Sequence, residues 1–113
     1  MNKFELFTMI FYALDLYYDH NPSEELGRFL SEMSPFTFKQ IGSADPAVFK
    51  NFSDFISDRE ITIDNSYSLA LEYVQSIKNV DIFTIFSETK EEKWIEGCKK
   101  YLATAHKGMN SDK

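Results

Sequence analysis

The chain is poor in the residue types that build most recognisable functional sites. Its 113 residues include four glycines, two histidines and one cysteine. The glycines are isolated, so neither a dinucleotide-binding glycine motif nor a P-loop occurs. The single Cys98 cannot form an internal disulfide, and the cysteine content therefore implies no oxidising compartment. Two histidines leave few ligands for a zinc-type metal site.

Basic charge is also scarce. Twelve Lys and Arg residues stand against eighteen Asp and Glu residues, which gives a net charge of −6. Binding to phosphate groups requires a concentrated basic face, so this balance argues against nucleic acid and an anionic membrane as partners. The acidic excess lies in residues 1–87, whereas residues 88–113 are nearly balanced.

No apolar run approaches the roughly 20 residues that a membrane-spanning helix needs. Lys3, followed by apolar residues 6–14, resembles a short secretory signal. Glu5, however, lies in its charged region, Asp15 follows the apolar run, and no small-x-small cleavage site is present. We therefore expect this segment to be a structural helix and the protein to be cytoplasmic. Ten lysines against two arginines suit an AT-rich bacterial genome.

Aromatic side chains are abundant, with eleven Phe, six Tyr and one Trp. A single domain of this length buries roughly 65% of its unfolded surface, and these large side chains fill much of its core. Hydrophobic periodicity places five helices over about two thirds of the chain. The sequence therefore predicts an all-α fold, a compact bundle of five to six helices. Residues 1–108 form the domain and residues 109–113 a frayed tail.

The boundaries of the expected helices come from capping residues and prolines. The helices run over about residues 3–19, 22–33, 46–57, 65–79 and 90–107. The expected N-caps are Asn21 before Pro22, Asp45 before Pro46 or alternatively Ser43, Asp64, and Thr89 in a capping box.

Three further stretches are compatible with short extended structure. Residues 36–41 contain an alternating Phe-Thr-Phe that fits a strand or one helical turn. Residues 61–63 belong to a linker and are expected to be briefly extended. Residues 80–86 are apolar and fit either a short helix or a strand.

The first helix carries a narrow polar stripe on an otherwise apolar surface. The stripe steps by three or four residues and consists of Glu5, Thr8, Tyr12, Asp15 and Asp19. The fourth helix carries a similar stripe of Ser68, Glu72, Gln75 and Asn79. We expect both stripes to be the exposed edges of helices that are otherwise covered by other helices or by a second copy of the chain. Tyr12 faces either water or a partner.

Asp15, Asp19 and His20 are the best candidates for a metal or acid–base site, because carboxylates four residues apart share one helix face. No Glu-x-x-His or His-Glu-x-x-His pairing accompanies them. We interpret the two carboxylates as a solvated edge and His20 as a residue that favours the C-terminal helix dipole. No metal or other cofactor is predicted.

Cys98 and His106 do not form a nucleophile pair, since eight helical residues separate them by about 12 Å. Cys98 is expected in the core, and Gly97 is expected at a close helix contact or, alternatively, near a ligand. The chain contains no nucleophile elbow, kinase motif or zinc motif. No catalytic residue is predicted, and the protein is expected not to be an enzyme.

Phe36 and Phe38 lie in the irregular loop, where they either pack on the core or, if exposed, act as binding anchors. With Tyr12 they are the predicted binding residues. We predict a non-enzymatic protein–protein interaction or regulatory module that acts as a homodimer or on a basic partner. Small immunity-type proteins that neutralise toxins have a comparable composition.

Two alternatives remain open. The first is a small-ligand-binding domain with an aromatic pocket between the first and fourth helices, lined by Tyr12, Tyr17, Tyr67 or Tyr73. The second is a structural subunit of a larger assembly.

Overall fold

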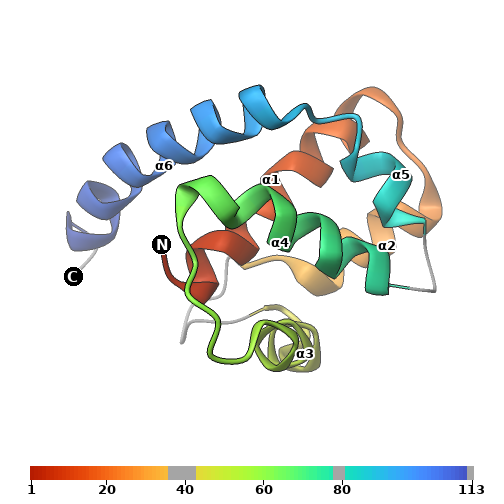
Figure 1. Ribbon diagram of the computed structural model, residues 1–113. Coiled ribbons are helices and arrows are strands. Elements are labelled where there is room, and N and C mark those ends of the chain that lie inside the picture. Colours follow the sequence, from red (N-terminus) through yellow and green to blue (C-terminus); the bar gives the residue numbers. More distant parts are fainter. Residues whose placement is uncertain (36–42, 78–80, 112–113) are drawn as a thin grey trace.

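The computed structural model describes the backbone of residues 1–35, 43–77 and 81–111, and side chains as far as Ala103. Every regular element in these ranges is a helix, which confirms the predicted all-α bundle (Figure 1). The helices are α1 (Lys3–His20), α2 (Glu24–Met33), α3 (Pro46–Ile56), α4 (Ile63–Ser76), α5 (Ile82–Phe86) and α6 (Glu91–Ser111). None of the described helices is long and apolar enough to cross a membrane.

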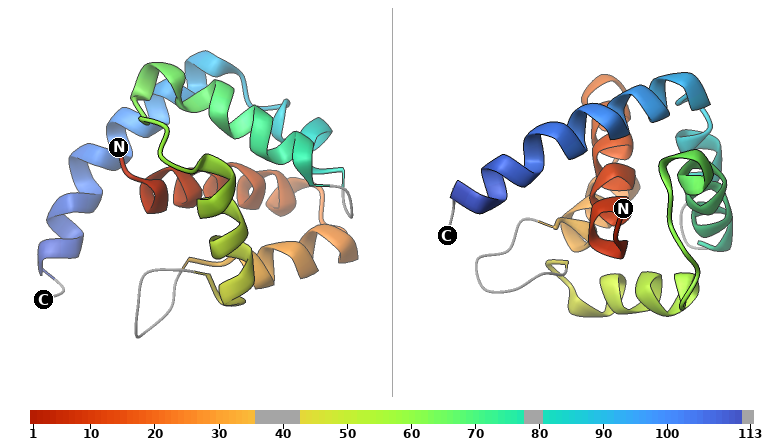
Figure 2. Two further views of the ribbon diagram at one scale, coloured as in Figure 1. Left: turned by 60° about the horizontal axis from the view of Figure 1, so that its bottom comes forward. Right: turned by 60° about the vertical axis from the view of Figure 1, so that its left-hand side comes forward.

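Helix α1 is the central element and packs against each of the other five helices. Figure 2 shows α1 between α4 and α6 on one side and α2 and α3 on the other. Leu6, Phe7, Ile10 and Leu14 of α1 are completely buried. The Phe7 ring lies 5.1 Å from the ring of Phe52 on α3. Burial of each such side chain contributes about 1.5–3 kcal/mol, so the apolar face of α1 organises the core.

The predicted start of the second helix is wrong. Asn21 ends α1 instead, because its backbone N–H donates to the carbonyl of Tyr17. Ser23 then caps α2 from an extended backbone, and its Oγ accepts from the N–H of Leu26. Asn21 is already the C-cap of α1. The next residue along the chain whose side chain can cap a helix is Ser23.

The fourth helix also starts earlier than predicted. Thr62, not Asp64, is its N-cap, and it forms a capping box with Asn65. The Thr62 hydroxyl accepts from the Asn65 N–H, while Asn65 Oδ1 accepts from the Thr62 N–H. This reciprocal pair satisfies two free N–H groups rather than one. The predicted cap Asp45 and the proline that follows it do start α3.

The three stretches compatible with extended structure contain no strand where the structure describes them. Residues 61 and 62 have no regular structure, and Ile63 begins α4. Residues 82–86 form α5, with Ile82 and Phe86 buried one turn apart on the same face. A helix pairs its own backbone N–H and C=O groups, whereas a strand at this place would need a second strand beside it to pair them. Residues 36–41 and 80 lie outside the described residues.

Candidate functional site on the outer face of helix α1

The polar stripe of α1 is only partly exposed. Glu5 and Thr8, predicted at a wet edge, are 5% and 2% exposed. Both residues lie near α6, since Thr8 and Glu5 are close enough to Tyr101 of that helix to affect its pKa. The methyl group of Met9 lies 3.5 Å from the position that a Cβ on Gly97 would take. The Glu5 carboxylate accepts from the N–H of Asn2 at the helix N-terminus. A Cβ at Gly97 would make an ordinary van der Waals contact with Met9, so α6 packs against α1 here without requiring glycine.

Tyr12 lies at the boundary between the covered and uncovered parts of the stripe. It is 40% exposed, and its ring meets the ring of Tyr101 on α6 edge-on at 5.9 Å. Burial raises the pKa of Tyr101, and the neighbouring Thr8 hydroxyl opposes this rise. Thr8 Oγ1 has no hydrogen bond of good geometry within the described residues, so its interaction with Tyr101 is long or poorly aligned.

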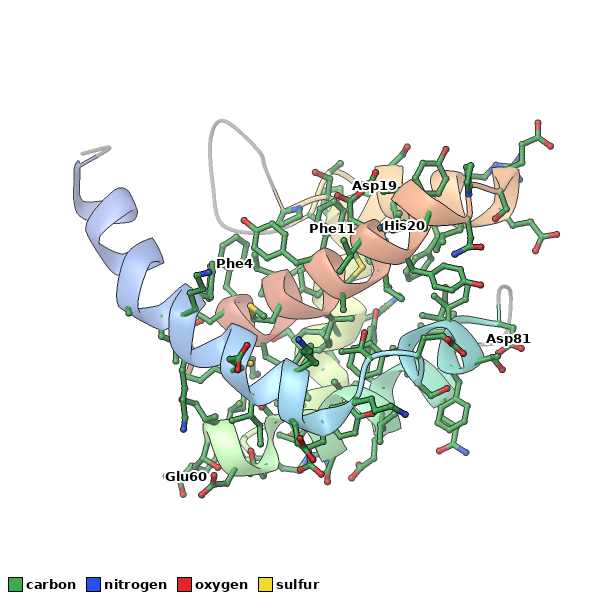
Figure 3. The ribbon with its side chains drawn as sticks, turned by 90° about the horizontal axis from the view of Figure 1, so that it is seen from above. Phe4, Phe11, Asp19, His20, Glu60 and Asp81 are labelled. Atoms are coloured by element: carbon green, nitrogen blue, oxygen red, sulfur yellow. The ribbon has the colours of Figure 1, made fainter. Side chains whose placement is uncertain are left out.

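Beyond Tyr12, the outward side of α1 is uncovered. Figure 3 shows α6 crossing the N-terminal part of α1 and leaving the end that carries Asp19 and His20 free of it. Leu16, whose residue type favours the core, is 61% exposed. Asp19 is exposed and Asp15 is half-buried. We call Tyr12, Asp15, Leu16 and Asp19 the outer face of α1.

His20 ends this face without joining a metal site. Its Nδ1 lies 3.1 Å from the carbonyl oxygen of Leu16, where a protonated Nδ1 donates to one of the free carbonyls of the last turn. Within the described residues, no group of three His, Cys, Asp or Glu side chains is arranged to hold a metal ion.

A groove of about 310 Å³ runs beside the outer face, between α1 and α2. Its lining includes Phe11, Asp15, Tyr18, Gly27, Leu30 and Ser31. Asp15 is the charged residue of this lining, and it belongs to the outer face as well. A Cβ on Gly27 would lie 3.0 Å from the Tyr18 hydroxyl, so glycine on α2 leaves room for the side chain of Tyr18. The groove extends the acidic part of the outer face.

A second groove, of about 330 Å³, lies between α2, α3 and α4. Its apolar lining is Phe29, Val48, Phe55, Tyr73 and Ile77, and its polar lining is Glu32, Asn51 and Ser76. Of the four tyrosines expected around a pocket, Tyr73 lines this groove. Tyr12 lies against α6 instead, and the hydroxyl of Tyr67 donates to the carbonyl of Thr89 at 2.7 Å.

Cys98 lies in the core, as its position on the apolar face of its helix predicts. It is completely buried, and its Sγ lies 4.0 Å from the hydroxyl oxygen of Ser66. Burial raises the pKa of the thiol to about 11, although the contact with Ser66 lowers it slightly. The thiolate is thus scarce at neutral pH, which makes Cys98 a poor nucleophile. The side chain of His106 lies outside the described residues.

The sequence missed Leu16 and could have found it. Leu16 lies one helical turn beyond Tyr12, at the border of the polar stripe, but its residue type alone placed it in the core. The predicted anchors Phe36 and Phe38 lie outside the described residues. No protein-family model, curated protein or solved structure is significantly similar to this chain.

Proposed function

We propose that this protein is a non-enzymatic, cytoplasmic interaction module that binds a basic protein partner through the outer face of α1. The observation that carries the proposal is the 61% exposure of Leu16 on the central core helix, one turn from the 40% exposed Tyr12. One exposed leucine is ordinary on a protein surface. Two large apolar side chains bordered by carboxylates instead resemble the anchors and polar rim of a binding site.

Charge favours a partner rich in Lys and Arg. Asp15 and Asp19 border the two apolar side chains, and residues 1–32 carry six acidic side chains against two basic ones. Of those two, Lys3 is engaged with α3, where its Nζ donates to the backbone and hydroxyl oxygens of Ser53 at 3.1 Å. The resulting negative field attracts a basic surface and accelerates association at low salt.

A second copy of the chain fits the outer face less well. Two-fold pairing through this face would bring Asp15 and Asp19 of one copy close to the same carboxylates of the other. Like charges that face each other across an interface are destabilising. We therefore expect a monomer in sedimentation equilibrium at physiological salt, and a dimer that Leu16→Lys dissociates would favour self-association instead.

Affinity capture from the native lysate with matched variants tests the proposal. Leu16→Lys places a cation in the middle of the outer face, and Ser68→Lys makes a similar change on the exposed edge of α4. We expect the wild type and Ser68→Lys to retain the same basic protein, and Leu16→Lys to retain at least about tenfold less. Equal recovery on all three baits would contradict binding through the outer face.

A further inference from the structure

The groove between α2, α3 and α4 contains a tyrosine hydroxyl without a hydrogen-bond partner among the described residues. Tyr73 is 3% exposed, and its ring meets the rings of Phe52 and Phe55 edge-on at 4.8 and 5.8 Å. Its hydroxyl makes no hydrogen bond with any residue that the structure describes. A buried tyrosine normally pairs its hydroxyl, so this one requires an explanation.

The hydroxyl opens on the groove. Thr8 Oγ1 is the only side-chain nitrogen or oxygen atom of the described residues that is fully buried and makes no hydrogen bond. The hydroxyl of Tyr73 is therefore not enclosed, although the residue as a whole is buried. Since Tyr73 lines the groove, that is the space into which its hydroxyl can donate. Burial raises the pKa of Tyr73 to about 12, so the group remains a donor at neutral pH.

The remaining lining defines the charge of a ligand. Among the described lining residues, Glu32 is charged, and Asn51 and Ser76 are neutral. The carboxylate of Glu32 in this described set favours a cation over an anion. Aromatic walls from Phe29 and Phe55 suit a flat apolar body. The volume of about 330 Å³ is at the small end of the range for small-molecule sites.

We propose that this groove binds a small primary amine on an aromatic body that also carries a hydrogen-bond acceptor. The ring lies between the apolar walls, the ammonium group pairs with the exposed Glu32, and the acceptor receives the hydrogen bond of Tyr73. None of the described lining residues of the groove belongs to the outer face of α1. This ligand site is consequently independent of the protein partner proposed above.

Tyramine is the probe, because it joins an ammonium group and a phenol oxygen on one ring. Two analogues serve as controls: 2-phenylethylamine lacks the phenol oxygen, and 3-(4-hydroxyphenyl)propionate replaces the amine with a carboxylate. Titration into the ¹⁵N-labelled full chain should give saturable amide shifts around Phe55 and Ile77, with a Kd on the order of 1 mM for tyramine. The propionate should give no saturable shift up to about 10 mM.

Variants assign the two polar contacts. Tyr73→Phe should weaken tyramine binding about fivefold and leave 2-phenylethylamine unchanged. Glu32→Gln should weaken both amines about threefold, whereas Glu25→Gln, a matched exposed carboxylate at the start of the same helix, should change neither. The proposal is overturned if tyramine gives no saturable shift, if the propionate binds as well as tyramine, or if Tyr73→Phe leaves the affinity for tyramine unchanged.

Discussion

The indole N–H of Trp94 donates a 2.7 Å hydrogen bond to the hydroxyl oxygen of Ser66 and so joins α6 to α4 inside the core. Both residues are at most 2% exposed. The Ser66 hydroxyl in turn donates to the carbonyl of Ile63 at 2.8 Å. Every polar group of this small network has a partner, which is the condition under which buried polar groups specify a packing arrangement.

We expect Ser66→Ala to destabilise the protein by about 1–3 kcal/mol, because it leaves the Trp94 N–H buried and unpaired. Urea unfolding followed by the fluorescence of Trp94, the single tryptophan, measures the change. Ser68→Ala, on the exposed edge of the same helix, is the control and should lie within about 0.5 kcal/mol of the wild type. Equal stability of the two variants would show that the indole hydrogen bond contributes nothing.

Alkaline pH should destabilise the protein. Burial raises the pKa of Cys98 from 9.0 to about 11 and that of Tyr73 from 10.0 to about 12. At a pH between the unfolded and folded pKa of either group, that group is ionised in the unfolded chain and neutral in the folded chain. The free energy of unfolding therefore has its full value below about pH 9 and falls above it. The loss approaches about 1.4 kcal/mol per pH unit for each group.

Stability measured by urea unfolding at several pH values tests this expectation. Tyr73→Phe removes one of the two ionisations, so its stability should decline less steeply than that of the wild type above pH 10. If the free energy of unfolding declined equally steeply with pH in both proteins, ionisation of Tyr73 would be excluded as a source of the loss of stability at alkaline pH.

The turn between α3 and α4 holds Ser57 in an unfavourable backbone conformation. Its φ of 60° and ψ of −130° suit the first central position of a type II′ turn, which the Arg59 N–H closes on the Ile56 carbonyl at 3.3 Å. Ser57→Gly should therefore stabilise the protein by about 1 kcal/mol, and Ser57→Val should destabilise it by more than that. Thermal unfolding ranks the variants, and a lower Tm for Ser57→Gly would argue against strain at this position.

Arg59 secures the same turn through its guanidinium group. Nε donates to the carbonyl of Ile56 and Nη2 to that of Phe55, while Nη1 pairs with Glu72 at 2.9 Å. The Glu72 pair is largely exposed and screened, so Glu72→Gln should cost less than about 0.5 kcal/mol. Arg59→Ala also removes both bonds to the end of α3 and should cost about 1–2 kcal/mol. If Glu72→Gln and Arg59→Ala lowered the free energy of unfolding equally, the ion pair and not the hydrogen bonds to the carbonyls would account for the stabilisation.

Local signals in the sequence were sufficient for the existence of five of the six described helices, but they misplaced the starts of α2 and α4. Asp45 before Pro46 starts α3 as predicted, because a cap and a proline act on the adjacent backbone alone. The signal at Asn21 was ambiguous, since the same side chain suits the end of one helix and the start of another. The position of α5 depended on burial of Ile82 and Phe86, which a short apolar run does not reveal.

The candidate sites depended more strongly on packing. Tyr12 and Tyr73 were both candidates from the sequence, but their surroundings differ because one contacts α6 and the other packs on α3. Glu32 was not a candidate, since nothing in its neighbourhood along the chain places it beside Tyr73. Residues that meet in a groove between three helices are brought together by chain turns, and periodicity within one helix carries no information about them.

By itself, the sequence determined that the protein is all-helical and that α1 is covered on most of its circumference, because both follow from the spacing of apolar residues within a helix. Only the tertiary structure decided which part of the α1 stripe meets water. Helix α6, from the other end of the chain, lies near the buried Glu5 and Thr8, whereas Leu16 is exposed. The crossing point of two helices depends on how their side chains interdigitate, which is a property of the pair and is not written in either helix alone.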